Sequence, residues 1–161
     1  MGTWLNGDGL YIRFGADEGK VQKTGEYEDS GYWGADHFVE ADISYTDLNA
    51  FGTDTILSDT VVIPNGARIT KAEMYVITAF TSGGSATLEL GTIRTDRSTT
   101  YDADGFVAAT AVASLTAGAT IAGSGALVNT TLANDGLLTA TVRTANFTAG
   151  RARLRVFWSM V

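Results

Sequence analysis

The chain has 161 residues and a formal net charge of −7; 45% of its residues are hydrophobic and 18% are charged, which suits one domain with its own core. It contains no cysteine and a single histidine, His37, which excludes disulfides, thiolate metal sites and any site built from two imidazoles. No stretch approaches the roughly 20 apolar residues that span a membrane, and residues 1–6 lack the features of a secretory signal. We therefore expect synthesis in a soluble compartment and no membrane contact.

Charge is distributed unevenly along the sequence. Residues 1–60 hold twelve acidic against three basic residues, a balance of −9, whereas residues 61–161 hold six against eight, a balance of +2. Nucleic-acid binding would need clustered Lys and Arg, so this pattern argues against it. An acidic front and a mildly basic body favour docking between copies of the chain or onto a basic partner, although solvated acidic loops fit the same charges.

Residues 1–36 are predicted to form an extended arm. Eight glycines interrupt every run, and only the segment 10–14 alternates as a strand does. Aromatic side chains bury large areas with few rotatable bonds, so in a polar arm they are good interface anchors. An arm that packs on its own domain is the alternative interpretation. The candidate anchors are Trp4, Tyr11, Phe14, Tyr32 and Trp33.

From residue 37 onward the pattern indicates strands. The segment 37–45 alternates between an apolar face and a polar, mainly acidic one. The apolar face is predicted to hold Val39, Ala41, Ile43 and Tyr45, and the polar face Glu40, Asp42 and Ser44. Further strands are predicted at 60–63, 68–80 and 86–90. The turn sequences of residues 64–66 and 82–85 separate them.

One segment is predicted to be helical. Residues 106–115 are rich in alanine, Asp104 precedes them, and Gly118 follows. This is the order of an N-cap, a helix-forming run and a C-terminal glycine. We therefore expect one short helix between strands, followed by a loop of small residues over 118–125.

Strands resume at 126–128 and 137–143, with a hairpin-type turn at 134–136, and end in the segment 151–161. In that last segment the even positions are apolar, and Arg151, Arg153 and Arg155 occupy odd positions. The predicted fold is all-β: an antiparallel β-sandwich of jelly-roll type over residues 37–161, with the short inserted helix and the extended N-terminal arm of residues 1–36.

The three arginines are candidate partner-binding residues. Residues two apart on a strand lie about 7 Å apart on one face, so these side chains form a basic row. Such a row could hold an anionic ligand or pair with carboxylates of another chain, for example the acidic arm of a neighbouring copy. Protection of an edge strand against aggregation is the alternative.

No pattern points to catalysis or to a cofactor. His37 lies beside Asp36 and Glu40 without a Gly-x-Ser-x-Gly elbow, which is typical of an ion-paired surface group. Asp102 and Asp104 start a pattern like that of a calcium loop, but the closing glutamate is missing. A hydrolase that uses paired carboxylates is kept only as a remote alternative. We expect no enzymatic activity, no metal and no cofactor.

Short runs in the chain resemble bacteriophage virion proteins. They are residues 60–69 (TVVIPNGARI), 82–91 (SGGSATLELG), 104–109 (DGFVAA), 115–120 (LTAGAT) and 125–128 (GALV). Over residues 55–161 the chain is similar to the capsid cement, or decoration, proteins of tailed phages. That resemblance implies a homotrimer on the outer surface of the virion, made in the host cytoplasm, which bridges subunits of the major capsid protein and resists the pressure of internal DNA.

Two other functions fit the same composition. A head-fibre, neck or tail component of a phage shares the β-rich texture with many threonine, glycine and alanine residues. A receptor- or carbohydrate-binding module would use aromatic residues such as Tyr32 and Trp33 to stack on sugar rings.

Overall fold

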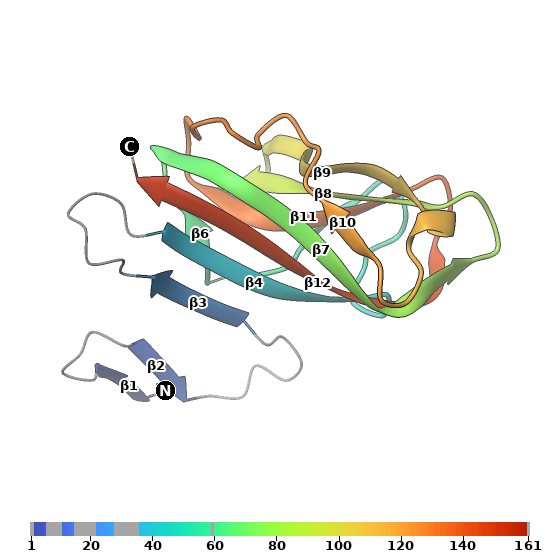
Figure 1. Ribbon diagram of the computed structural model, residues 1–161, viewed down its shortest axis with the longest axis horizontal. Helices are drawn as coiled ribbons and strands as arrows, with labels where there is room; N and C mark the ends of the chain where they lie inside the picture. Colours follow the sequence, from blue (N-terminus) through green and yellow to red (C-terminus); the bar gives the residue numbers. More distant parts are fainter. Residues whose placement is uncertain (1, 6–10, 15–21, 28–35, 59, 161) are drawn as a thin grey trace.

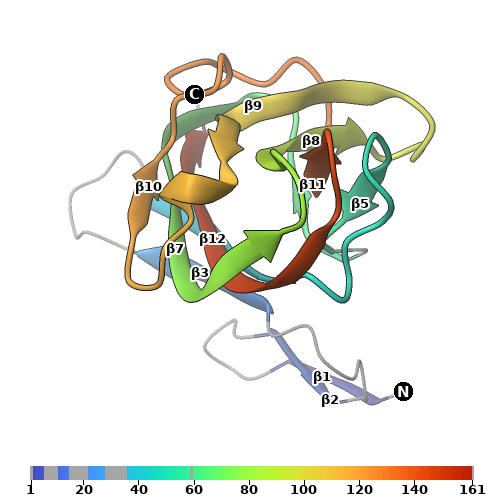
Figure 2. The same cartoon turned by 90° about the vertical axis from the view of Figure 1, so that its right-hand side faces the viewer.

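The computed structural model describes residues 2–5, 11–14, 22–27, 36–58 and 60–160, with side chains from residue 37 onward. One sheet contains β3 (Gln22–Tyr27), β4 (Asp36–Ser44), β7 (Ala67–Ser82), β10 (Thr120–Ala122) and β12 (Phe147–Met160). The other contains β5 (Asp54–Ile56), β6 (Val62–Ile63), β8 (Thr87–Arg94), β9 (Thr100–Ala111) and β11 (Gly136–Arg143). The two sheets lie face to face as a sandwich (Figures 1 and 2).

The strands pair in nested order. The first sheet has the order β10–β7–β12–β4–β3, and the second has the order β5–β11–β8–β9, with β6 also paired to β11. Thus β4 pairs with β12, β5 with β11, β7 with β10, and β8 with β9, each pair antiparallel. A chain paired in this way is one long hairpin rolled into two sheets, which is a jelly roll. The predicted antiparallel β-sandwich is confirmed.

The hydrophobic core lies between the sheets and comes mainly from alternate strand residues. In β12, Ala152, Leu154, Val156 and Trp158 are buried as their alternation predicts, whereas Met160 at the strand end is half exposed. Full burial of a large apolar side chain contributes about 1.5–3 kcal/mol. Fully buried side chains from both sheets include Ile43, Met74, Leu88, Leu90, Phe106 and Leu138.

The predicted helix over 106–115 is wrong. Residues 100–111 form β9, paired with β8, and Val112–Ser114 make a single 3₁₀ turn, η1. The register of β9 shifts on both sides of Leu90, and the adjacent Phe106 and Val107 are both fully buried. This pairing and burial outweigh helix preferences that amount to a fraction of a kcal/mol per residue. In the described part of the chain, no helix is long and apolar enough to cross a membrane.

One short strand lies elsewhere than predicted. Residues 126–128, predicted as a strand, form a turn, and β10 lies within the segment 118–125, predicted as a loop. The small residues there permit close packing. A Cβ on Gly123 would lie 2.8 Å from the Cβ of Ala72 and 2.9 Å from the carbonyl oxygen of Phe106.

Three strands come from the predicted arm. β3 extends the first sheet by pairing with β4, and β1 (Gly2–Leu5) pairs with β2 (Tyr11–Phe14) in a separate two-stranded hairpin. Both views show this hairpin beside the sandwich rather than stacked on its sheets (Figures 1 and 2). The division of the chain at residue 36 stays a prediction.

Gly91 in β8 lies where the backbone of β9 passes over it. A Cβ there would collide with the carbonyl oxygen of Asp102 and lie 2.5 Å from the carbonyl carbon of Ala103. We predict that Gly91→Ala lowers the free energy of unfolding by roughly 1–3 kcal/mol, measured by chemical denaturation. Gly83→Ala is the matched control, because no heavy atom lies within 4 Å of a Cβ built there. Equal stability of the two variants would contradict the close approach of the β9 backbone to Gly91.

Candidate functional site

The candidate site is the outer face of the first sheet, which consists of strand residues that point away from the core. β12 runs between β4 and β7, so its register decides which side chains are neighbours on this face. Arg153 lies opposite Asp42 of β4 and Tyr75 of β7, and Arg155 lies opposite Glu40. The face therefore sets a basic strand directly beside an acidic one.

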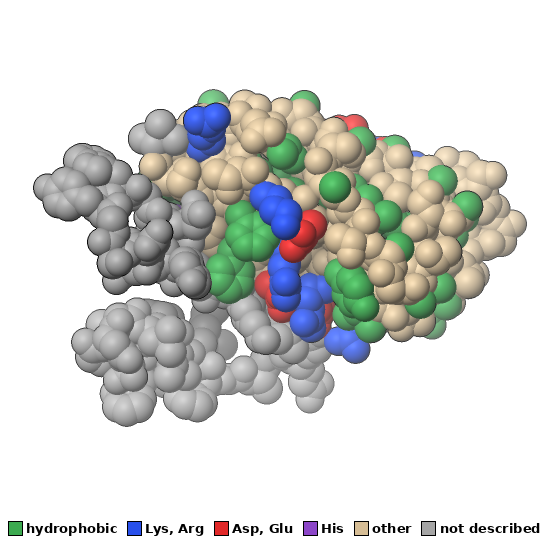
Figure 3. Space-filling model, in the orientation of Figure 1, with side chains coloured by type: hydrophobic (Ala, Val, Ile, Leu, Met, Phe, Trp, Pro, Cys, Tyr) green, Lys and Arg blue, Asp and Glu red, His purple; other side chains and the backbone are tan. Residues whose placement is uncertain are grey.

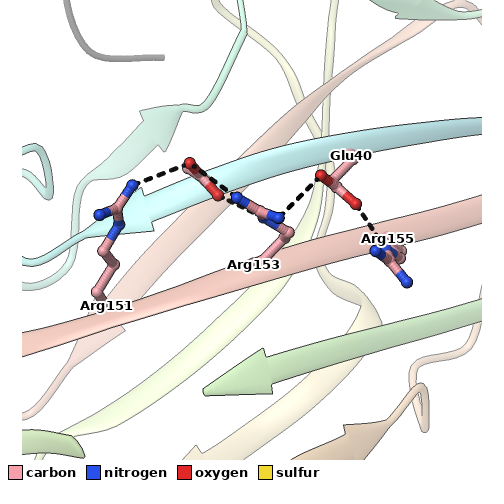
Figure 4. Close-up of polar contacts among 5 residues, drawn as sticks. Glu40, Arg151, Arg153 and Arg155 are labelled. Atoms are coloured by element: carbon pink, nitrogen blue, oxygen red, sulfur yellow. Dashed lines mark hydrogen bonds and ion pairs between the residues drawn. The ribbon is translucent and has the colours of Figure 1, made fainter. Parts of the chain in front are cut away.

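Five charged side chains alternate in sign across this face. Arg151 Nη2 lies 3.2 Å from Asp42 Oδ2, and Arg153 Nε donates to Asp42 Oδ1 at 2.7 Å. Arg153 Nη1 lies 3.3 Å from Glu40 Oε1, and Arg155 Nε donates to Glu40 Oε2 at 2.6 Å. We call these five residues the charge ladder (Figure 4).

The two carboxylates of the charge ladder are buried although they face away from the core. The side chains of Glu40 and Asp42 are 3% and 6% exposed, whereas those of the arginines are 30–52% exposed. Burial alone would raise the pKa of Asp42, but hydrogen bonds and charge from Arg153 and Arg151 outweigh it and hold that pKa below its ordinary value. The hydrogen bond to Asp42 in turn raises the pKa of Arg153. The guanidiniums are thus held firmly by buried counter-charges.

The position of β12 in the sheet distinguishes between the predicted roles of its three arginines. Because β12 is a central strand, the edge-protection interpretation is wrong. Arg151, Arg153 and Arg155 each pair with a carboxylate of their own chain, from the acidic face predicted for residues 37–45. The sequence therefore predicts both the row of arginines and the row of carboxylates, but no local pattern predicts that the two rows pair with each other. Their role in binding a partner stays a prediction.

The predicted aromatic anchors fall into two groups. Trp4, Tyr11 and Phe14 lie in β1 and β2, so the structure brings these three into one hairpin, which is separate from the sheet that carries the charge ladder. Tyr32 and Trp33 lie outside the described residues. Whether any of the five binds a partner stays a prediction.

A groove lies beside the charge ladder. Its volume is about 420 Å³, and it is lined by Glu73, Tyr75, Ile77, Thr120, Arg153 and Arg155. Tyr75 and Ile77 are 49% and 39% exposed. The charged row crosses the face with hydrophobic side chains on both sides (Figure 3). Exposed apolar surface next to fixed guanidiniums suits contact with a protein that presents carboxylates.

A second exposed aromatic site, which sequence reasoning missed, lies in the loop between β4 and β5. Tyr45, predicted on the apolar face of the segment 37–45, is instead 40% exposed because β4 ends at Ser44. Phe51 is 55% exposed. The Phe51 amide donates to Asn146 Oδ1 at 2.8 Å, and the Gly52 amide donates to the Val142 carbonyl at 2.7 Å. These bonds hold the loop on the end of β11 and on the turn that follows it. The sequence pattern that could have indicated this site is an aromatic residue followed by a glycine, Gly52, whose φ is +84°.

The charge ladder offers the chemistry of a binding site. Among the described residues, no group of three or more His, Cys, Asp or Glu side chains is placed to hold a metal ion. His37 stacks on Trp158, with ring centroids 5.8 Å apart. The charge ladder can accept an anionic group through charge-assisted hydrogen bonds, which are stronger than neutral ones.

By its strand order the chain is a two-sheet jelly roll. No family model matches the sequence, and no curated protein matches it. Solved phage capsid structures contain chains with this fold. A chain in the capsid asymmetric unit of cyanophage Pam1 gives a TM-score of 0.59 at 15% identity, over 93% of this chain and 94% of that one.

Two further chains share the fold. One, in the capsid of Ralstonia phage GP4, gives a TM-score of 0.59 at 18% identity, over 81% of this chain and 87% of that one. The other, in the acidic stable capsid structure of Helicobacter pylori bacteriophage KHP30, gives a TM-score of 0.51 at 13% identity, over 87% of this chain and 94% of that one. At these identities the likeness establishes the fold.

We predict that Glu40→Gln lowers the free energy of unfolding by roughly 1–3 kcal/mol, because Arg153 and Arg155 lose a buried counter-charge. Glu73→Gln is the matched control on the same face. Glu73 pairs with Lys71, whose side chain is 60% exposed, and such pairs contribute roughly 0–1 kcal/mol. Chemical denaturation measures both variants. If both variants lost the same free energy of unfolding, burial would not make the ion pairs of the charge ladder stronger than an exposed pair.

The lowered pKa of Asp42 makes stability depend on pH. Its folded-state pKa lies below the ordinary 3.8, so Asp42 contributes stability that is present above pH 3.8 and is lost as the pH falls through the folded-state pKa. We predict that the gap in melting temperature between the wild type and Asp42→Asn narrows as the pH is lowered from about 6 to about 3. Thermal unfolding followed by circular dichroism measures the gap.

Asp102 provides a control of opposite sign. Burial, and then the neighbouring Asp104, raise the pKa of Asp102, so its contribution is lost as the pH rises through the folded-state pKa. Relative to the wild type, Asp102→Asn should therefore become more stable as the pH rises over the same range. An identical trend in the two variants would contradict the assigned directions.

Proposed function

We propose that this chain is a structural protein of a bacteriophage virion, specifically a capsid cement (decoration) protein that binds the outer surface of the major capsid protein shell. The observation that carries the proposal is the likeness of fold to chains in three phage capsid structures. The alignments cover 87–94% of those chains, so each of them is little more than a single sandwich. A small sandwich of this kind suits a subunit added onto a shell.

The surface chemistry supports the same role. The chain has no cysteine, so its fold does not depend on the oxidising conditions that disulfides need. The described outer face offers exposed apolar side chains and fixed charges, which are the elements of a protein contact. A cement protein works through many weak contacts, and repetition over a shell multiplies modest affinities. Homotrimers of this chain would bridge neighbouring shell subunits.

The hairpin β1–β2 is the proposed attachment element. A two-stranded hairpin alone is marginally stable in water at best, so it gains stability by packing against another surface. We assign that surface to the major capsid protein. Trp4, Tyr11 and Phe14 would supply the apolar area of the contact, and Tyr32 and Trp33 would extend it along the arm.

A second candidate function is receptor or carbohydrate binding on a head fibre, neck or tail. The observation that favours it is a hollow of about 290 Å³ whose lining includes Tyr45, Asn49 and Asn146. An aromatic ring beside amide groups suits a sugar, which offers both an apolar face and hydroxyl groups.

The deciding experiment adds the purified full-length chain to heads of the parent phage that lack it. We predict saturable binding at a fixed ratio to the major capsid protein, measured by sedimentation and gel densitometry, and a higher temperature of DNA release from decorated heads. Deletion of residues 1–21, which spares β3, should abolish binding while circular dichroism shows an intact sandwich. Tyr45→Ala is the matched control and should bind as the wild type does.

Two results would change the proposal. Binding that survives the deletion of residues 1–21 would remove the hairpin from the mechanism. Absence of binding to heads, together with a glycan-array signal that Tyr45→Ala abolishes, would replace the cement role with the second candidate.

A further inference from the structure

The outer face of the first sheet has an excess of positive charge at its centre, unlike the chain as a whole. The charge ladder and the Lys71–Glu73 pair beside it hold four cations and three carboxylates, an excess of +1 in a chain of net charge −7. Lys71 Nζ lies 2.6 Å from Glu73 Oε2. Glu73 is therefore neutralised by Lys71, although it also lines the groove.

Arg155 has donors to spare. It donates to Glu40 through Nε, and no other described residue bonds its two Nη groups, while its side chain is 48% exposed. A guanidinium presents five N–H donors in a planar fork, so its free edge can bind a second carboxylate. Because buried Glu40 already holds the fork in place, less conformational entropy is lost when that carboxylate binds.

A pair of carboxylates on the other sheet has no ionic partner among the described residues. Asp102 and Asp104 lie two residues apart in β9, and the Asp104 amide donates to Asp102 Oδ1 at 3.3 Å. Within the described residues, no Lys or Arg forms an ion pair with either carboxylate. Burial, and then the proximity of Asp104, raise the pKa of Asp102, so a cation from outside would relieve an unfavourable interaction.

We propose that Arg153 and Arg155 bind Asp102 and Asp104 of a second copy of this chain, with Tyr75 packing at the contact. The charges are complementary, because the excess of cations on the first sheet would meet two close carboxylates that have no cation among the described residues. The two surfaces belong to different sheets, so the contact is head-to-tail, and its repetition gives either a closed ring or an open filament. A ring of three rests on the proposed cement function, whereas the contact itself needs no capsid.

The acidic arm of a neighbouring copy is the competing occupant of this face. Residues 1–36 hold seven acidic against three basic residues. Their acidic residues are spread from position 8 to position 36 of the sequence, whereas Asp102 and Asp104 lie together in one strand. The geometry therefore favours β9.

The test is the oligomeric state of the full-length chain, measured by size-exclusion chromatography with light scattering. We expect an oligomer at low salt that dissociates as salt screens the partly exposed charges. Thr120→Glu adds a carboxylate to the groove at an exposed position outside the charge ladder, and Asp104→Arg reverses the other surface. Each should weaken association at least about tenfold, and the double variant should restore it, because the new charges attract each other.

Two controls show whether a change in association comes from this contact. Asp135→Arg makes the same change of charge at an exposed site outside both surfaces and should associate as the wild type does. Circular dichroism checks the fold of each variant. A monomer at every salt concentration, or an oligomer unaffected by Thr120→Glu and Asp104→Arg, would overturn the proposal.

Two further results distinguish the alternatives. An oligomer that Asp104→Arg leaves intact but deletion of residues 1–21 abolishes would make the acidic arm the occupant and overturn the β9 contact. The opposite result is also possible: Thr120→Glu and Asp104→Arg weaken association, the double variant restores it, and the protein does not bind phage heads. That result would support the contact between copies and contradict the cement function.

Discussion

The central position of β12 in its sheet is the constraint on which the rest of the structure depends. The strand has 14 residues and pairs with β4 on one side and β7 on the other. Its inward side chains fill the core, and its outward arginines lie against the carboxylates of β4. One strand therefore links hydrophobic and electrostatic stabilisation. A register slip of one residue would exchange the two faces and expose the apolar set.

The buried faces of β4 and β12 could be predicted from sequence, because alternation with a period of two is a local property. The contacts of the candidate site could not. Nothing in the sequence near Arg153 indicates Asp42 as its neighbour, since that contact follows from the pairing of distant strands. The burial of Glu40 and Asp42 follows from the same pairing. The residues of the charge ladder were therefore predictable, whereas its geometry was not.

Local patterns fail where distant contacts oppose them. Residues 106–115 have the start and stop residues typical of a helix. Because Phe106 is buried in the core and β8 provides backbone hydrogen-bond partners, most of the segment forms a strand instead. The loop between β4 and β5 is a comparable case. Its exposed Phe51 is held in place through Asn146, which lies almost a hundred positions further along the chain. A sequence shows the aromatic residue but not the side chain that fixes its loop.

The nested pairing also makes the two ends of the sandwich different. β4 enters and β12 leaves at one end, where His37 lies opposite Trp158, and the loop with Tyr45 and Phe51 follows Ser44 at the other end. The two ends are roughly 25 Å apart along β4. A polypeptide fused to the C-terminus would emerge beside the N-terminal segment, whereas one inserted next to Phe51 would project from the far end. The fold is thus a spacer that holds two attachment points at opposite ends.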